Sequence, residues 1–100
     1  MIKFNPWEIE QEIKKELDQG NIVYCYSEPK SSITSRRYFR KIEQTQSKIK
    51  LTHILAEKTR TSKSEETFDL PFKLAAFWTP AKSSWNFYQL TKVEWLSLLI

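Results

Sequence analysis

Glycine is almost missing from this sequence. Its 100 residues include a single glycine, Gly20, whereas average usage would give about seven. Loops that hold nucleotide phosphates need glycines, because only a residue without a side chain lets the backbone approach a phosphate closely. The sequence therefore excludes Walker-type and Rossmann-type nucleotide-binding enzymes.

Cysteine and histidine occur once each, as Cys25 and His53. A single cysteine cannot form an internal disulfide, which is typical of proteins in a reducing compartment. The two residues cannot supply the full ligand set of a zinc site, so we expect no metal and no cofactor. We interpret Cys25 as a small buried apolar residue and His53 as a hydrogen-bonded core or rim residue. A catalytic Cys25–His53 pair would need both side chains in one pocket, and without such a pair we expect no enzyme.

Long hydrophobic runs are also missing. The longest, WLSLLI, covers residues 95–100 and is interrupted by Ser97, far short of the ~20 residues that span a bilayer. The N-terminal residues contain no apolar segment of signal-peptide length. We therefore expect a cytoplasmic protein without membrane contact, folded as a single domain over residues 1–100.

Residues 6–19 have the pattern of an amphipathic helix. Asn5 suits the N-cap and Pro6 the first helical position. Apolar residues then recur every four positions between charged ones, at Ile9, Ile13 and Leu17. Gly20 is expected to end the helix.

A second helix is predicted at the end of the sequence. Thr91 and Glu94 have the spacing of a capping box, in which each side chain caps the backbone of the other residue. The segment VEWLSLLI that follows is so apolar that it must be buried, either within the domain or against a partner. A homodimer formed through this C-terminal helix is one such arrangement.

The sequence between the two helices is typical of strands. Its β-branched, aromatic and alternating apolar residues predict strands at residues 21–27, 33–46, 47–57, 67–78 and 85–90. Residues 33–46 are also compatible with a helix, because Tyr38 and Ile42 have i,i+4 spacing. Residues 59–66 contain no apolar residue and predict a loop. The expected fold class is α+β, with an N-terminal helix, a four- to five-stranded antiparallel sheet and a short apolar C-terminal helix, both helices covering one face.

The net charge of +4 is distributed unevenly along the sequence. Residues 1–20 contain three lysines and five acidic residues, a net charge of −2, whereas residues 30–63 contain ten basic residues and two acidic ones, a net charge of +8. The basic charge therefore falls on the predicted central hairpin, and this asymmetry points to an anionic partner for its surface.

Within that hairpin, the segment SRRYFRK at residues 35–41 combines cations with aromatic rings. Side chains alternate along a strand, so the exposed row contains either the odd-numbered or the even-numbered residues of this segment. Cations of such a row neutralise phosphates while a ring stacks on a base, for roughly 1–3 kcal/mol. The candidate nucleic-acid-binding residues, expected to form one continuous positive surface with an accessible ring, are Arg36, Arg37, Tyr38, Phe39, Arg40, Lys41, Lys48 and Lys50.

These residues favour a small non-enzymatic domain that binds nucleic acid, single-stranded in preference, through a basic and aromatic hairpin. Two other interpretations stay open. A basic outer strand is often only a solvated surface, on which lysines prevent aggregation between strand edges. Alternatively, the protein is an interaction module, an adaptor or inhibitor of a larger complex that could itself handle nucleic acid. Such a module would bind an acidic protein surface through the basic face and the apolar C-terminal helix.

The segment NFYQLTKVEWLSLL, residues 86–99, resembles the region that joins the last strand to the helix in single-stranded-DNA-binding proteins of the positive cofactor 4 type. In both, a short strand leads into a capped helix that carries a tryptophan and spaced leucines. The resemblance covers fourteen residues and implies binding of single-stranded DNA. The sequence departs from that pattern in its acidic N-terminal helix.

Overall fold

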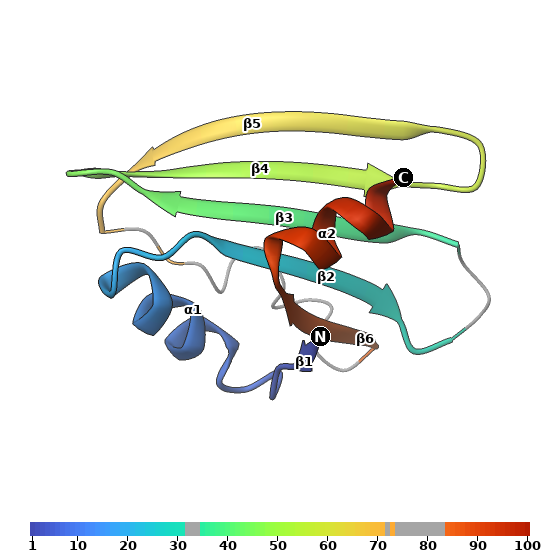
Figure 1. Cartoon of the computed structure of the whole chain (residues 1–100), viewed down its shortest axis with the longest axis horizontal. Coiled ribbons are helices and arrows are strands. Elements are labelled where there is room, and N and C mark those ends of the chain that lie inside the picture. Colours follow the sequence, from blue (N-terminus) through green and yellow to red (C-terminus); the bar gives the residue numbers. More distant parts are fainter. Residues whose placement is uncertain (32–34, 72, 74–83) are drawn as a thin grey trace.

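An antiparallel sheet forms the centre of the protein in the computed structural model (Figure 1). The structure describes residues 1–31, 35–71, 73 and 84–100. Six strands of these residues pair in the order β1-β6-β2-β3-β4-β5. The strands are β1 (Ile2–Lys3), β2 (Val23–Pro29), β3 (Arg37–Gln44), β4 (Lys48–Ala56), β5 (Thr61–Asp69) and β6 (Trp85–Leu90). The helices are α1 (Ile9–Asp18) and α2 (Lys92–Leu99).

The α+β fold class is confirmed, but the described sheet has six strands where four to five were predicted. One addition is β1, a strand of two residues that pairs with β6. Strand β5 is an earlier start of the strand predicted over residues 67–78: it occupies most of the predicted loop at residues 59–66 and pairs with β4 along its whole length. The strand predicted over residues 67–78 continues β5 only to Asp69; residues 72 and 74–78 lie outside the described part of the chain.

Helix α1 begins at Ile9 rather than at Pro6, and it ends close to where it was predicted to end. The Asn5 side-chain oxygen accepts a hydrogen bond from the Trp7 backbone N–H at 3.0 Å, and the Asn5 carbonyl accepts one from the Glu8 N–H at 3.0 Å. These bonds form a turn that precedes the helix, because asparagine side chains favour such turns over helical backbone. At the other end, Gly20 has a φ of +80°, the left-handed conformation that glycine adopts most easily.

The two helices cover opposite faces of the sheet, so the prediction of a single covered face is wrong. Val23 and Cys25 of β2 belong to a core cluster with the buried residues of α1. Tyr24 and Tyr26 point the other way and belong to a second cluster with Trp95 of α2. Because β2 lies inside the sheet and is apolar on both sides, each face needs its own cover.

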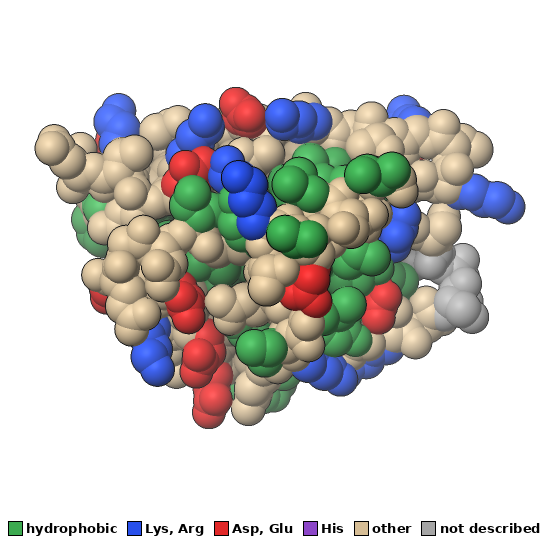
Figure 2. All heavy atoms as spheres, viewed as in Figure 1, with side chains coloured by type: hydrophobic (Ala, Val, Ile, Leu, Met, Phe, Trp, Pro, Cys, Tyr) green, Lys and Arg blue, Asp and Glu red, His purple; other side chains and the backbone are tan. Residues whose placement is uncertain are grey.

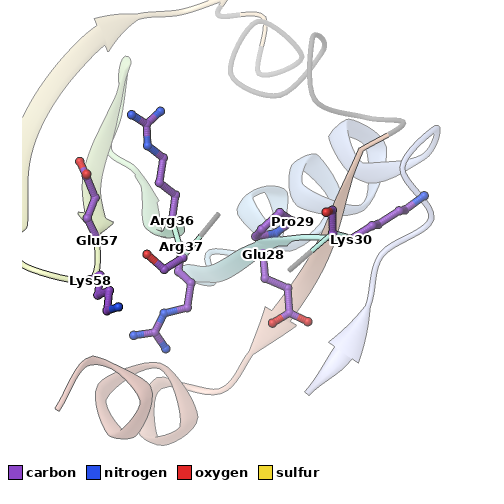
Figure 3. A pocket seen from close by; sticks show the side chains of 9 residues that line it. Glu28, Pro29, Lys30, Arg36, Arg37, Glu57 and Lys58 are labelled. Carbon is purple, nitrogen blue, oxygen red and sulfur yellow. The ribbon is translucent and has the colours of Figure 1, made fainter. Parts of the chain in front are cut away.

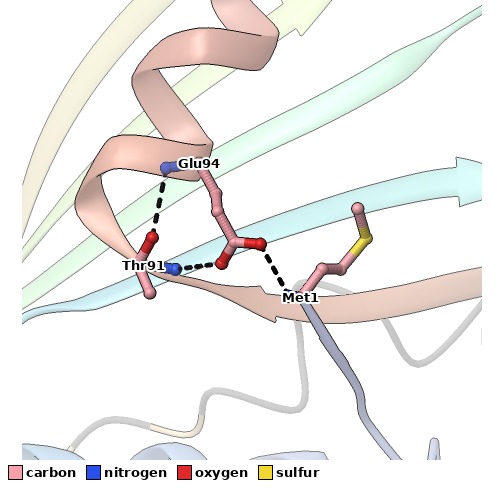
Figure 4. Close-up of polar contacts among 3 residues, drawn as sticks. All are labelled: Met1, Thr91 and Glu94. Carbon is pink, nitrogen blue, oxygen red and sulfur yellow. Dashed lines mark hydrogen bonds and ion pairs between the residues drawn. The ribbon is translucent and has the colours of Figure 1, made fainter.

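The capping box of α2 forms as predicted (Figure 4). The Thr91 hydroxyl oxygen accepts from the Glu94 N–H at 3.1 Å, and the Glu94 carboxylate accepts from the Thr91 N–H at 2.8 Å. The ammonium group of Met1 also donates to this carboxylate, at 2.6 Å. That hydrogen bond and the one from Thr91 lower the pKa of Glu94. The cap therefore joins the start of α2 to the N-terminal strand.

The molecule is elongated, with extents of 39 × 26 × 22 Å. Helix α1 lies at one end of the long axis, and the C-terminal ends of β2 and β4 lie at the other (Figure 1). Among the described residues, neither helix has the length and apolar character needed to cross a bilayer.

Candidate functional site

The eight candidate residues do not form one surface, so the prediction of a continuous positive face is wrong. Arg40 pairs with Cys25 of the α1 face in the register of β2 and β3. Phe39 pairs with Tyr26 and belongs to the cluster under α2. Consecutive side chains of a strand point to opposite faces. Tyr38 and Arg40 therefore lie on the α1 face, and the other β3 candidates lie on the α2 face.

Phe39 and Arg40, at the middle of the predicted site, are both buried. The Phe39 ring lies 5.0 Å from that of Tyr26 and 6.3 Å from that of Trp95, measured between centroids. Arg40 is only 6% exposed; it donates to the Ser27 hydroxyl at 3.2 Å, and its guanidinium carbon lies 5.0 Å from the Tyr38 ring centroid. Burial lowers the pKa of Arg40, but a guanidinium stays charged. These two side chains stabilise the fold and are not available to a surface ligand.

Tyr38 is half-buried on the α1 face, within a group of rings. Its centroid lies 5.2 Å from that of His53 and 5.1 Å from that of Trp85. Burial, and after it the charge of Arg40, lowers the pKa of His53 to about 4. His53 was expected to be hydrogen-bonded, but its Nε2 atom is buried and has no hydrogen-bond partner among the described residues. His53 is therefore a neutral residue at pH 7.

Cys25 and His53 do not form a catalytic pair. The register places Arg40 between them, opposite Cys25 on β2 and opposite His53 on β4. Two strand spacings separate the thiol strand from the imidazole strand, roughly 10 Å. Cys25 is buried, as predicted, and burial raises its pKa to about 12. A buried neutral thiol without a neighbouring base is not a nucleophile.

Three candidate lysines do lie together, on the α2 face of β3 and β4, but carboxylates neutralise most of their charge. The Lys41 ammonium lies 3.2 Å from the Glu43 carboxylate, and the Lys48 ammonium lies 3.6 Å from the Asp69 carboxylate. Lys50 forms no ion pair with a described carboxylate. Asp69 lies in a segment that was predicted to be a strand, but its pairing with β4 was not predicted, so its effect on this surface was missed.

A larger concentration of cations lies at the end of the sheet opposite α1. There, a hollow of about 560 Å³ opens between the end of β2, the start of β3 and the turn after β4 (Figure 3). Four exposed cationic side chains line it: Lys30, Arg36, Arg37 and Lys58. We call these four residues, with the carboxylates Glu28 and Glu57 that also line the hollow, the basic hollow.

The sequence analysis found two of these four cations, Arg36 and Arg37, and missed Lys30 and Lys58. The four are brought together because β3 and β4 pair antiparallel over almost equal lengths, with Arg37 opposite Ala56. After the hairpin, the chain is therefore back at the end of the sheet where β3 began. The useful signal was the presence of lysines in both connecting segments, which a hairpin of this length must place side by side.

Both carboxylates in the basic hollow have partners other than its four cations. Glu28 accepts hydrogen bonds from the Tyr26 hydroxyl at 3.0 Å and from the Tyr88 hydroxyl at 3.3 Å. Burial, together with this carboxylate, raises the pKa of both tyrosines. Glu57 pairs with Arg60, outside the hollow, at 3.7 Å. The carboxylates are thus engaged by groups that hold them in place.

Fewer cations of the basic hollow than lysines near β5 are paired with carboxylates. Lys30, Arg37 and Lys58 form no ion pair with any described carboxylate. The Arg37 guanidinium carbon lies 5.8 Å from the centroid of the Phe39 ring, which holds the side chain without neutralising it. With Arg60 included, this end of the molecule has five cations and two carboxylates, a net charge of +3. This end of the molecule therefore has an excess of positive charge.

Groups that could hold a metal ion are absent from the part of the chain that the structure describes, since no three histidine, cysteine or acidic side chains gather there. No family model matches the chain, and no curated protein and no solved structure matches it either.

Proposed function

We propose that the protein binds nucleic acid through the basic hollow. The observation that carries this proposal is the convergence of four exposed cations, from two separate connections and the first residue of β3, on one hollow of about 560 Å³. Phosphate contacts supply most of the affinity in sequence-independent binding of nucleic acid, and lysine and arginine are the residues that make them. Binding without catalysis needs no metal or cofactor, and we keep the cytoplasm as its expected location.

The shape of the basic hollow favours a polymer of phosphates over a single small anion. Arg36 and Arg37 leave the chain in opposite directions (Figure 3), so cations on both sides of β3 are within reach of a ligand that crosses the end of the sheet. A flexible single strand can follow this path. A duplex bends only over a persistence length of about 150 base pairs. Single-stranded DNA or RNA is therefore the preferred ligand.

The proposal relies on phosphates more than on bases. No aromatic ring lines the basic hollow among the described residues, and Tyr38, on the same side of the chain as Arg36, is half-buried among other rings. Stacking would otherwise add roughly 1–3 kcal/mol for each base. We therefore expect little discrimination between sequences.

Fluorescence anisotropy with a labelled oligo-dT strand and a labelled RNA of the same length, in low salt, tests this proposal. The double substitution Arg37→Ala and Lys58→Ala should weaken both complexes about tenfold or more, since two phosphate contacts are lost. The matched control is Lys14→Ala with Lys15→Ala, which removes the same charge from the exposed surface of α1. Absence of binding by the wild type, or an equal loss in the control, would contradict the proposal.

A third double variant distinguishes the basic hollow from the centre of the hairpin. Lys41→Ala with Lys50→Ala removes two cations from the α2 face of β3 and β4. If the hollow is the site, this variant should bind the same oligonucleotides within about twofold of the wild type. A loss as large as that of the Arg37 and Lys58 variant would move the site back to the hairpin surface.

A further inference from the structure

A second surface lies on the α2 face, between α2 and the edge strand β5. Helix α2 packs over β2 and β6, its Trp95 contacts Tyr24 and Phe39, and the edge strand β5 beyond it stays exposed on this face. A groove of about 280 Å³ remains beside the helix. The residues that define this groove, the α2 groove from here on, are Lys41, Lys50, Lys63, Ile54, Leu96 and Leu99.

The side of the α2 groove next to the helix is apolar and accessible. Ile54 forms part of its floor, with 8% of its surface exposed, and Leu99 is half-buried. Leu96 is 46% exposed, and Val93, one helical turn away, is 71% exposed. Figure 2 shows hydrophobic side chains gathered on this face, with lysine or arginine side chains beside them. Exposed apolar side chains gathered on one helix mark a contact surface.

The opposite side of the α2 groove is cationic. Lys41 and Lys63 each lie near a carboxylate, at 3.2 Å from Glu43 and 3.6 Å from Glu65. Lys50 lies on β4 opposite Glu43 in the register, but it forms no ion pair with a described carboxylate. With three lysines, the carboxylate of Glu65 and that of Glu43 beside Lys41, the groove has a net charge of +1. A ligand of this groove should therefore place apolar groups near Leu96 and a negative charge near Lys50.

We propose that the α2 groove binds an acidic amphipathic segment of a partner protein. Leucine-like side chains of that segment would pack against Ile54, Leu96 and Leu99, and its carboxylates would pair with Lys50 at the rim. Amphipathic segments are bound in this way when an apolar groove receives anchors from one face of a helix. The α2 groove, at about 280 Å³, is smaller than ordinary small-molecule pockets. It therefore suits individual anchor side chains of a partner.

Two other occupants fit the α2 groove less well. A nucleic acid base would need an accessible ring, but Trp95 is buried and its indole N–H donates to the Cys25 carbonyl at 3.2 Å. A second copy of the chain, related by two-fold symmetry, would bring the same patch against itself. Lys50 and its neighbouring lysines would then face the lysines of the other copy, which disfavours a homodimer through this surface.

Selection of a displayed library of random peptides on the immobilised wild-type protein tests the proposal. Enriched peptides should combine Asp or Glu with Leu, Ile, Phe or Met. For a synthetic copy of the best peptide, Leu96→Glu and Lys50→Glu should each weaken binding about tenfold or more, the loss expected from one central contact. Matched controls are Ile2→Glu, at an exposed apolar residue of β1 at the opposite edge of the sheet (69% exposed), and Lys15→Glu, which should leave affinity within about twofold.

Several outcomes would overturn this proposal. Enriched peptides without an acidic bias, or affinities that neither groove variant changes, would contradict it. Self-association that Leu96→Glu abolishes would assign the surface to a second copy instead. Because Arg37→Ala with Lys58→Ala should leave peptide binding unchanged while oligonucleotide binding falls, failure of this proposal is distinguishable from failure of the nucleic-acid proposal. Circular dichroism of each variant confirms that it is folded.

Discussion

Arg40 lies in the middle of a polar row that crosses three strands of the α1 face. Cys25 of β2 and His53 of β4 are its direct neighbours in the register. A buried guanidinium disfavours a second positive charge beside it, so it adds to the effect of burial on the imidazole. Both contributions lower the pKa of His53 to about 4. The fold therefore disfavours the protonated form of the single histidine in this chain.

This pKa leads to a pH-dependent stability. Between the ordinary histidine value of 6.5 and a folded value of about 4, the unfolded chain binds more protons at this residue than the folded chain. The free energy of unfolding should therefore fall as pH is lowered through this window, and the contribution of His53 should be fully present above it. Urea denaturation at pH 7, 5.5 and 4 should show a larger loss for the wild type than for His53→Gln.

Carboxylates also titrate in that pH range, so the comparison between wild type and variant isolates the histidine. The NMR titration of the His53 ring protons provides a direct check, with a midpoint well below 6.5 expected. A midpoint near the ordinary value, or parallel pH profiles for the two proteins, would show that the imidazole is solvated rather than held beside Arg40.

At the scale of helices and strands, the ends of the helices could be predicted from the sequence, but the pairing of the strands could not. Gly20 and the Thr91–Glu94 box mark helix ends because capping involves residues only a few positions apart. Residues 61–66 of β5 were predicted as a loop because this exposed part of an edge strand has no apolar alternation to reveal it. The placement of the helices on opposite faces depends on which strands become neighbours. No local sequence pattern predicts these neighbours.

The candidate site shows the same division. Composition correctly predicted that the basic residues would fall on β3, β4 and the segments beside them. It could not show that Phe39 and Arg40 are buried, because that depends on α2 and on the partners of β3. Lys30 and Lys58 are far apart in the sequence, so composition also gave no sign that they meet. The β3–β4 hairpin brings them to the same end of the sheet.

The cap of α2 gives a prediction at this scale. Thr91→Ala removes the hydroxyl oxygen that accepts from the Glu94 N–H at 3.1 Å, and loss of such an N-cap costs about 1 kcal/mol. Urea denaturation should show this loss in the free energy of unfolding. Ser97→Ala, at an exposed position of the same helix, is the matched control and should be neutral or slightly stabilising. Equal effects of both substitutions would mean that the hydroxyl contributes nothing to the helix.

At the scale of the whole molecule, charge is separated along the long axis. The residues of α1 contain four acidic and two basic side chains, a net charge of −2. The basic hollow with Arg60, net +3, lies at the other end. Such a separation orients the protein in the field of an anionic polymer and increases the rate of productive encounters. The α2 groove lies on the face between these two ends, so a bound peptide there need not block the hollow.

Salt dependence measures how many cations of the hollow contact phosphates. For a single strand, the logarithm of the association constant falls with the logarithm of salt concentration by roughly 0.7 for each phosphate neutralised. Four contacts therefore predict a slope of roughly −2.8, and Arg37→Ala with Lys58→Ala should reduce it to about half of that. The Lys14 and Lys15 control should keep the wild-type slope, because those lysines lie on α1. A slope that is the same for all three proteins would mean that the contacts are made elsewhere on the molecule, whatever the affinities are.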